Sequence, residues 1–156
     1  DLHSFPTRRS SDLWQTGRCD VVAPSARFHP PGPAGVLHEP ADVAAWLRGR
    51  GAGAVVLTRG SAPVLWWCGA QSGSAAPPAV GAVDTLGAGD VFHGALALAL
   101  ARALPGRRSG GGEGGGGAAR IAPAALVDAV ASACAVAAAS TEHFGTRAWI
   151  AAIPRG

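Results

Sequence analysis

The stretch over residues 83–94 constrains this chain more than any other, because it joins an apolar run to a helical pattern through a glycine-rich turn. It reads Val-Asp-Thr-Leu-Gly-Ala-Gly-Asp-Val-Phe-His-Gly, and the apolar residues before it predict a strand over 79–83. Small residues let a backbone approach a phosphate closely. The helix start adds unpaired N–H groups and the positive end of the helix dipole. The pattern predicts an anion-binding turn formed by Gly87, Ala88 and Gly89.

Asp90 follows this turn and would lie in the first turn of the helix. A carboxylate beside a bound phosphate can take a proton from an attacking hydroxyl group, which is the task of a general base in phosphoryl transfer. The competing interpretation is an ordinary strand–turn–helix junction, in which Asp90 only favours the helix start. A Walker phosphate loop is excluded, since the chain has no lysine.

Short apolar runs and helical patterns alternate along the rest of the chain, which favours an α/β fold with an open, mostly parallel sheet and flanking helices. The run over 54–58 is typical of a strand buried on both faces. The other expected elements are a strand at 19–23, helices at 39–50, 89–104 and 123–140, a hairpin within 64–74, a loop at 30–40 and a short apolar end at 148–153.

Two segments stand apart from this pattern. Residues 1–13 have no apolar period and look like the translation of a sequencing adapter, so we expect a non-native leader there and one domain over 14–156. Residues 107–117 are two arginines and a serine followed by glycines and one glutamate, which predicts a flexible linker between two helices.

Composition excludes several classes of function. The formal net charge is +3, and no arginine stripe with interleaved aromatic residues occurs, so nucleic-acid binding is not expected. Cys19, Cys68 and Cys134 are widely spaced, which argues against a zinc site or a disulfide framework. The longest apolar run, over 95–101, is too short to span a bilayer. We expect a cytoplasmic protein with reduced thiols.

Residues 84–90, Asp-Thr-Leu-Gly-Ala-Gly-Asp, closely resemble the signature of the ribokinase-like (PfkB) family of carbohydrate kinases. The resemblance covers about residues 19–153 and implies a ribokinase-like fold truncated to its C-terminal half. It also implies ATP as the phosphoryl donor, with Mg²⁺, and K⁺ as a candidate second cation. In this family Asp90 matches the catalytic base, and Gly87, Ala88 and Gly89 match the anion hole.

Further residues gain expected roles from the same resemblance. Thr58 and Gly60 fall where the family has Thr-x-Gly beside the nucleotide, although a strand-ending turn would look the same. Asp84 matches an aspartate that helps to hold a monovalent cation in several relatives; the alternative is a turn acid. Cys134 lies where some relatives contact adenine, and a buried small hydrophobe is the competing interpretation. His93 either approaches the substrate or packs as a polar helix residue.

The chain also departs from the family pattern. Many members carry Asn-x-x-Glu for magnesium, whereas residues 25–28 here are Ser-Ala-Arg-Phe. The serine, together with Leu-Gly-Ala-Gly-Asp downstream, is more similar to the ketohexokinase and sulfofructose kinase branches than to ribokinase.

The resulting prediction is ATP-dependent phosphorylation of a hydroxyl group on a small sugar. The alternatives are a nucleoside kinase of the same family and a non-catalytic nucleotide-binding remnant. A Rossmann-type binding protein fits less well, because its glycine-rich turn follows the first strand. The matched half lacks the family's sugar pocket and lid, so we expect no kinase activity from this chain alone and a possible homodimer only for the full-length protein.

Overall fold

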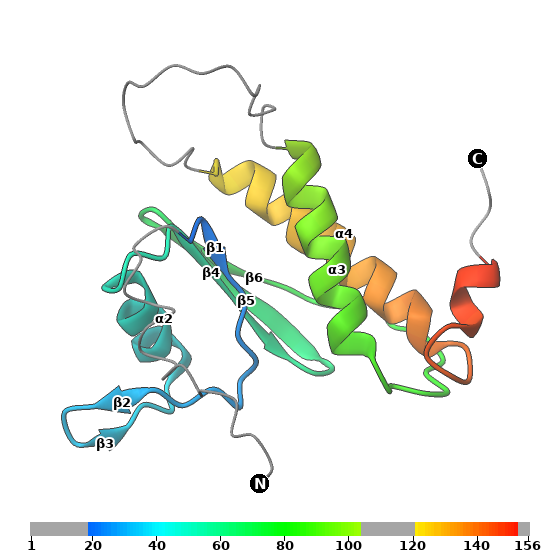
Figure 1. Ribbon diagram of the computed structural model, residues 1–156, viewed down its shortest axis with the longest axis horizontal. Helices are drawn as coiled ribbons and strands as arrows, with labels where there is room; N and C mark the ends of the chain where they lie inside the picture. The colour runs from blue at the N-terminus through cyan, green and yellow to red at the C-terminus, as the bar shows by residue number, and fades with distance from the viewer. Residues whose placement is uncertain (1–18, 104–120, 153–156) are drawn as a thin grey trace, which may run out of the picture.

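A mixed four-stranded sheet forms the centre of the protein. The computed structural model describes residues 19–103 and 121–152 (Figure 1). The sheet order is β1 (Val21–Val22), β4 (Ala54–Arg59), β5 (Ala62–Cys68) and β6 (Gln71–Ala75). β1 pairs with β4 in parallel, whereas β4, β5 and β6 pair in an antiparallel manner. The α/β class with an open sheet is confirmed. The parallel share is smaller than expected because tight two-residue turns connect the last three strands.

Helices cover both faces of this sheet (Figure 1). One face packs against α2, and the opposite face packs against α3 and α4. A small hairpin of β2 and β3 precedes α2, and a 3₁₀ helix follows α4. Their bounds are β2 (Pro31–Gly32), β3 (Gly35–Val36), α2 (Pro40–Arg48), α3 (Ala88–Ala103), α4 (Pro123–Thr141) and η1 (Ala148–Ala152).

The alternation of side chains along β4 explains this layering. Ala54 and Val56 belong to the apolar cluster shared with α3 and α4, and Val55 and Leu57 belong to the cluster shared with α2. All four are at most 2% exposed. Successive side chains of a strand point to opposite faces, so a strand between two helical layers is apolar at every position. The prediction of a strand buried on both faces is confirmed.

Small side chains let α3 and α4 pack closely. Ala129 and Ala133 of α4 are buried in the same cluster as Phe92 and Leu96 of α3. By length and composition alone, α4 is also the one described helix that could cross a membrane. Core helices of soluble proteins pass the same test, and α4 packs against α3 and the sheet, so this is weak evidence for a span.

The predicted strand over 79–83 is wrong. Residues 76–85 form no regular element, and the Val83 side chain is 64% exposed. A strand needs a neighbour to satisfy its backbone. Here the Val83 N–H donates instead to the carbonyl oxygen of Thr141, at the end of α4, at 2.7 Å.

The loop expected over 30–40 contains the β2–β3 hairpin and the start of α2. Sequence reasoning missed this hairpin because each strand has only two residues. The expected leader 1–13 and linker 107–117 lie outside the described residues.

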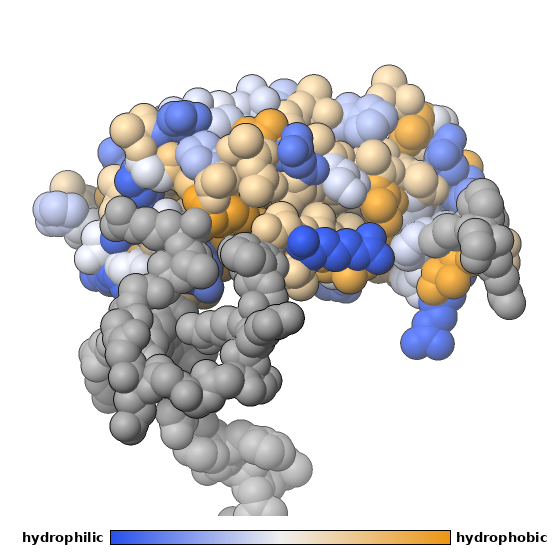
Figure 2. All heavy atoms as spheres, turned by 90° about the horizontal axis from the view of Figure 1, so that it is seen from above, coloured by the Kyte–Doolittle hydropathy of each residue, from blue (hydrophilic) through white to orange (hydrophobic). Residues whose placement is uncertain are grey.

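Several large apolar side chains remain exposed among the described residues. Figure 2 shows hydrophobic and hydrophilic residues interspersed over the face seen from above. Singly exposed apolar residues are normal on soluble proteins. The exposed ones are Val36, Val80, Val83, Leu86, Leu98, Phe144 and Ile150.

Candidate active site

The glycine-rich turn leads directly into α3, as the sequence predicts. Gly87 has a φ of +81°, a backbone conformation that favours glycine. A Cβ built at Gly87 would also lie 3.3 Å from Cγ2 of Thr146. The helix begins at Ala88, whose N–H donates to the carbonyl oxygen of Thr85 at 3.2 Å. Both the turn and the nearby Thr146 side chain therefore favour glycine at position 87.

Unpaired backbone donors lie at the start of α3. Among the described residues, the N–H groups of Gly89 and Asp90 have no hydrogen-bond partner. A Cβ built at Gly89 would meet no protein atom within 4 Å. Free donors, open space and the positive end of a 16-residue helix together suit a bound anion.

Asp90 lies beside these donors, in the first turn of α3. Its side chain is exposed and has no hydrogen-bond or ion-pair partner among the described residues. A carboxylate that is not used for structure can accept a proton from a bound hydroxyl group. The arrangement places the predicted base next to the predicted anion site.

Asp84 has a different environment, because both of its carboxylate oxygens accept backbone hydrogen bonds. Oδ1 accepts from the Leu86 N–H and Oδ2 from the Gly145 N–H, each at 2.9 Å. These two bonds, that from Leu86 first, lower the pKa of the Asp84 carboxyl group. Asp84 thus joins the turn before α3 to the loop after α4. Sequence reasoning identified Asp84 but not its partner Gly145.

The carboxyl ends of β1 and β4 lie close to this helix start. Ala23 follows β1, and its carbonyl oxygen lies 2.8 Å from Nε2 of His93 on α3. The next residue, Pro24, accepts a hydrogen bond from the Thr58 N–H at 3.0 Å. The segment of Ala23 and Pro24 therefore contacts both His93 on α3 and Thr58 on β4.

Two other predicted nucleotide-binding residues have structural explanations. Gly60 has a φ of +63° and lies in the two-residue turn between β4 and β5. Cys134 is 3% exposed and belongs to the apolar cluster between the sheet and α4. Burial raises the pKa of its thiol group. These environments favour a turn role for Gly60 and a packing role for Cys134, and their contacts with nucleotide stay predictions.

The described residues do not build a divalent metal site by themselves. No group of three or more His, Cys, Asp or Glu side chains comes together within 19–103 and 121–152. Ser25 begins the segment that replaces the expected Asn-x-x-Glu motif, and its hydroxyl oxygen accepts from the Arg27 N–H at 3.3 Å. Magnesium bound to a nucleotide needs only one or two protein carboxylates.

The chain is similar to known proteins in sequence and in fold. Residues 31–152 match the sequence profile of the pfkB family of carbohydrate kinases. No curated protein matches the chain.

Solved structures with the same fold include three kinases. A fructokinase double mutant from Vibrio cholerae O395, bound to fructose, ADP and potassium, has a TM-score of 0.65 and 23% identity over 88% of this chain and 39% of that chain. An aminoimidazole riboside kinase from Salmonella enterica, bound to aminoimidazole riboside and an ATP analogue, has a TM-score of 0.63 and 21% identity, covering 88% and 41%. A ribokinase from Thermotoga maritima has a TM-score of 0.61 and 21% identity, covering 92% and 42%. The chain spans about two fifths of the length of these structures.

Proposed function

We propose that this chain, which belongs to the pfkB family of carbohydrate kinases, is the nucleotide-binding and catalytic part of an ATP-dependent kinase acting on a hydroxyl group of a small sugar. The observation that supports this most is the start of α3. Among the residues that the structure describes, the N–H groups of Gly89 and Asp90 have no partner there, and neither has the exposed carboxylate of Asp90 beside them. Phosphoryl transfer needs mainly electrostatic stabilisation and a positioned base, and this arrangement supplies both.

Each group then has a defined task. The N–H groups of Gly89 and Asp90, where the turn formed by Gly87, Ala88 and Gly89 leads into α3, stabilise negative charge on the transferring phosphoryl group. Asp90 accepts the proton of the sugar hydroxyl as its oxygen forms the new bond to the γ-phosphorus of ATP, and the bond from that phosphorus to the bridging oxygen of ADP breaks. Mg²⁺, held by the ATP phosphates, would supply further neutralisation of their charge.

The remaining site residues complete the proposal. Thr58 lies near the end of β4 and Gly60 lies in the turn that follows it. We assign both residues to the nucleotide, and Cys134 to its adenine end. Asp84 would approach a monovalent cation such as K⁺ while keeping its two backbone bonds, since each carboxylate oxygen can accept more than one partner. The similarity to the ketohexokinase branch stays a prediction, as do a cytoplasmic location and a homodimer.

The acceptor could also be a nucleoside, because the similar structures include an aminoimidazole riboside kinase as well as a fructokinase. A second candidate, nucleotide binding without turnover, is favoured by one observation. Residues 25–28 lack the family's Asn-x-x-Glu, and the described residues form no acidic cluster that would replace it.

The test compares two identical substitutions in the complete gene product that contains this chain. Asp90→Asn keeps the shape of the side chain and removes its basicity, so turnover on a panel of sugars and nucleosides should fall on the order of a hundredfold or more. ATP affinity should change little. Asp42→Asn is the matched control, because Asp42 also lies in the first turn of a helix, α2. Equal turnover of both variants would refute Asp90 as the base, and ATP binding by an inactive wild type would favour the second candidate.

A further inference from the structure

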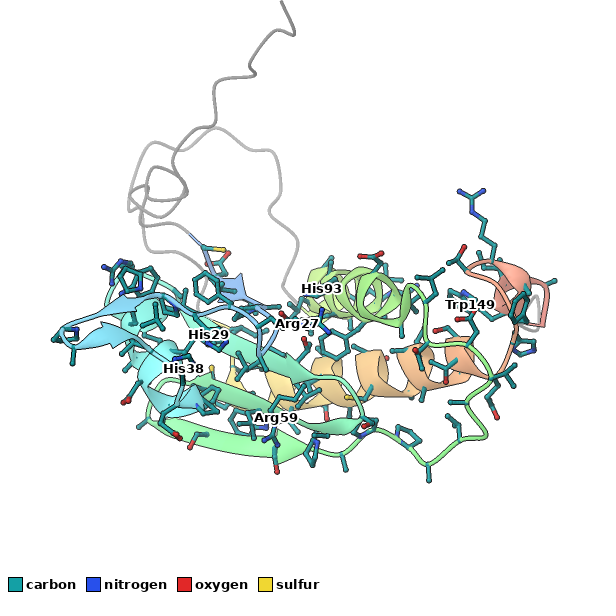
Figure 3. The ribbon with its side chains drawn as sticks, turned by 90° about the horizontal axis from the view of Figure 1, so that it is seen from below. Arg27, His29, His38, Arg59, His93 and Trp149 are labelled. Carbon is teal, nitrogen blue, oxygen red and sulfur yellow. The ribbon has the colours of Figure 1, made fainter. Side chains whose placement is uncertain are left out.

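His93 makes two contacts that join α3 to the sheet. Its Nδ1 lies 2.6 Å from the carbonyl oxygen of Gly89, one turn earlier on the same helix. Its Nε2 lies 2.8 Å from the carbonyl oxygen of Ala23, which is 70 residues away in sequence. Figure 3 labels His93 on α3, near the end of the sheet where β1 lies. The imidazole ring therefore bridges two backbone segments.

The chemistry of the ring defines what these contacts are. A carbonyl oxygen only accepts hydrogen bonds, so each contact requires an N–H group on the imidazole nitrogen that faces it. A neutral imidazole donates to one of the two oxygens, and an imidazolium ion donates to both. The imidazolium ion therefore joins both segments, whereas a neutral ring links α3 to Ala23 only when its proton is on Nε2. The contact with Ala23 is the long-range one, and the next residue, Pro24, accepts from Thr58 of β4.

The contacts of His93 restrain the first turn of α3 on the side away from the core. Phe92 is 4% exposed and fixes the core side of α3. His93 follows Phe92 and lies on the exposed side of α3. Residues three apart on a helix lie on one face, so His93 lies next to Asp90. With both sides held, the first turn of α3 resists rotation about the helix axis. Without the bridge, only the core side holds it.

We propose that His93 is a positioning residue that fixes the first turn of α3, and with it Asp90, against the end of β1. The inference rests on the proposed kinase function, in which the Asp90 carboxylate must meet a hydroxyl group in line with a phosphate. A displacement of about 1 Å at such a site can cost on the order of a hundredfold in rate. His93 itself is not assigned a contact with substrate.

Three variants of the complete gene product separate the two contacts. His93→Leu removes both donors. His93→Asn places its amide N–H near the Nδ1 position and keeps only the local bond to Gly89. His93→Gln reaches the Nε2 position and keeps the bridge to Ala23. We expect Leu and Asn to lower kcat about tenfold or more, with a smaller effect on KM for ATP, because in-line attack tolerates less displacement than ground-state binding does. His93→Gln should lose less.

Amide hydrogen exchange gives a second readout that does not depend on activity. The N–H groups of residues 91–94 should exchange faster in the Leu and Asn variants than in wild type and His93→Gln, because the first turn opens more often. Unchanged exchange in His93→Leu would overturn the inference even if kcat fell.

Asp90→Asn, measured in parallel, distinguishes a failure of the positioning role of His93 from a failure of the proposed kinase function. If Asp90→Asn loses turnover while His93→Leu keeps it, the proposed function stands and the positioning role is wrong. If all three His93 variants lose kcat equally and melt at equally lower temperatures, His93 is merely structural and the inference is again overturned. If Asp90→Asn keeps turnover, the assignment of the base fails, and with it the positioning of that base by His93.

Discussion

The carboxylate of Asp84 accepts a hydrogen bond from the N–H of Gly145 at 2.9 Å, across 61 residues of sequence. The same carboxylate accepts from Leu86, so one side chain joins the segment before the anion-binding turn to the loop after α4. Thr146, whose Cγ2 would lie 3.3 Å from a Cβ at Gly87, directly follows Gly145. The geometry of the candidate site thus depends on the loop at residues 145 and 146 as well as on residues 84–90.

The Asp84 link should make stability depend on pH. Its two backbone bonds lower the folded-state pKa below the unfolded value, so the link contributes stability above the unfolded pKa of about 3.9. That contribution is lost as the pH falls through the folded pKa. Wild type should unfold at a higher urea concentration than Asp84→Asn at pH 7, and the gap should be smaller at pH 3, which lies below the unfolded pKa.

A control variant makes this measurement specific. Asp128 is exposed on α4 and has no hydrogen-bond partner among the described residues. Asp128→Asn should match wild type in urea at pH 7. A gap between wild type and Asp84→Asn that is the same at both pH values would contradict the role given to the charge of Asp84.

The two glycines of the turn should respond differently to alanine. Gly87 has a φ of +81° and a close neighbour in Thr146, so Gly87→Ala should destabilise the protein by about 1–2 kcal/mol. A Cβ at Gly89 meets no protein atom within 4 Å, and alanine favours a helix. Gly89→Ala should therefore keep full stability and weaken ATP binding, because its Cβ enters the space proposed for phosphate.

Denaturant unfolding and ATP titration of both variants check this contrast. Tight ATP binding by Gly89→Ala would argue against the anion hole. A loss of stability in that variant would mean that protein atoms lie within 4 Å of the added Cβ.

Local patterns in the sequence predict much of this fold. The helices from Pro40, Ala88 and Pro123 begin within a residue or so of their expected starts, because proline, glycine and apolar spacing are local signals. The strand expected over 79–83 is wrong because strand formation depends on a neighbouring strand, and no local pattern reveals whether one is present. The antiparallel pairing of β4 with β5 was missed because the apolar run over 54–58 is typical of a strand in a parallel sheet, although Gly60 also fitted a strand-ending turn.

In the candidate site, too, local features could be predicted and distant partners could not. The glycine turn and Asp90 are adjacent in sequence, and their helix-start geometry follows from that spacing. The partners of Asp84 and His93 could not be predicted, because Gly145 and Ala23 contribute backbone atoms, and backbone atoms carry no residue-type signal.

The three cysteines should differ in reactivity toward an alkylating reagent. Cys19 is exposed, whereas Cys68 and Cys134 are buried. Burial raises the pKa of both buried thiols, and for Cys68 the nearby Arg48 guanidinium opposes this only in part. The thiolate is the nucleophile, so native protein should be modified at Cys19 first, and at the other two only in denaturant. Peptide mass spectrometry measures this order.

The same experiment tests the proposed adenine contact. If Cys134 serves only in packing, ATP should not change its modification in native protein beyond any general stabilisation that also slows Cys68. Selective protection of Cys134 by ATP would instead support a contact with nucleotide, and rapid native modification of Cys134 would contradict its burial.

Gly73 on β6 should tolerate no side chain, because it lies opposite Trp66 of β5 in the antiparallel register. A Cβ built at Gly73 would lie 2.7 Å from Cζ2 of Trp66, and this indole is 8% exposed, so it has little room to move. Overpacking of a well-filled core costs about 1–3 kcal/mol. Gly73→Ala should lower the free energy of unfolding in guanidinium by an amount in this range. Gly81→Ala is the matched control, since a Cβ there meets no atom within 4 Å. Equal stability of the two variants would show that the Trp66 ring does not cover Gly73 in solution, and the β5–β6 pairing would then need revision.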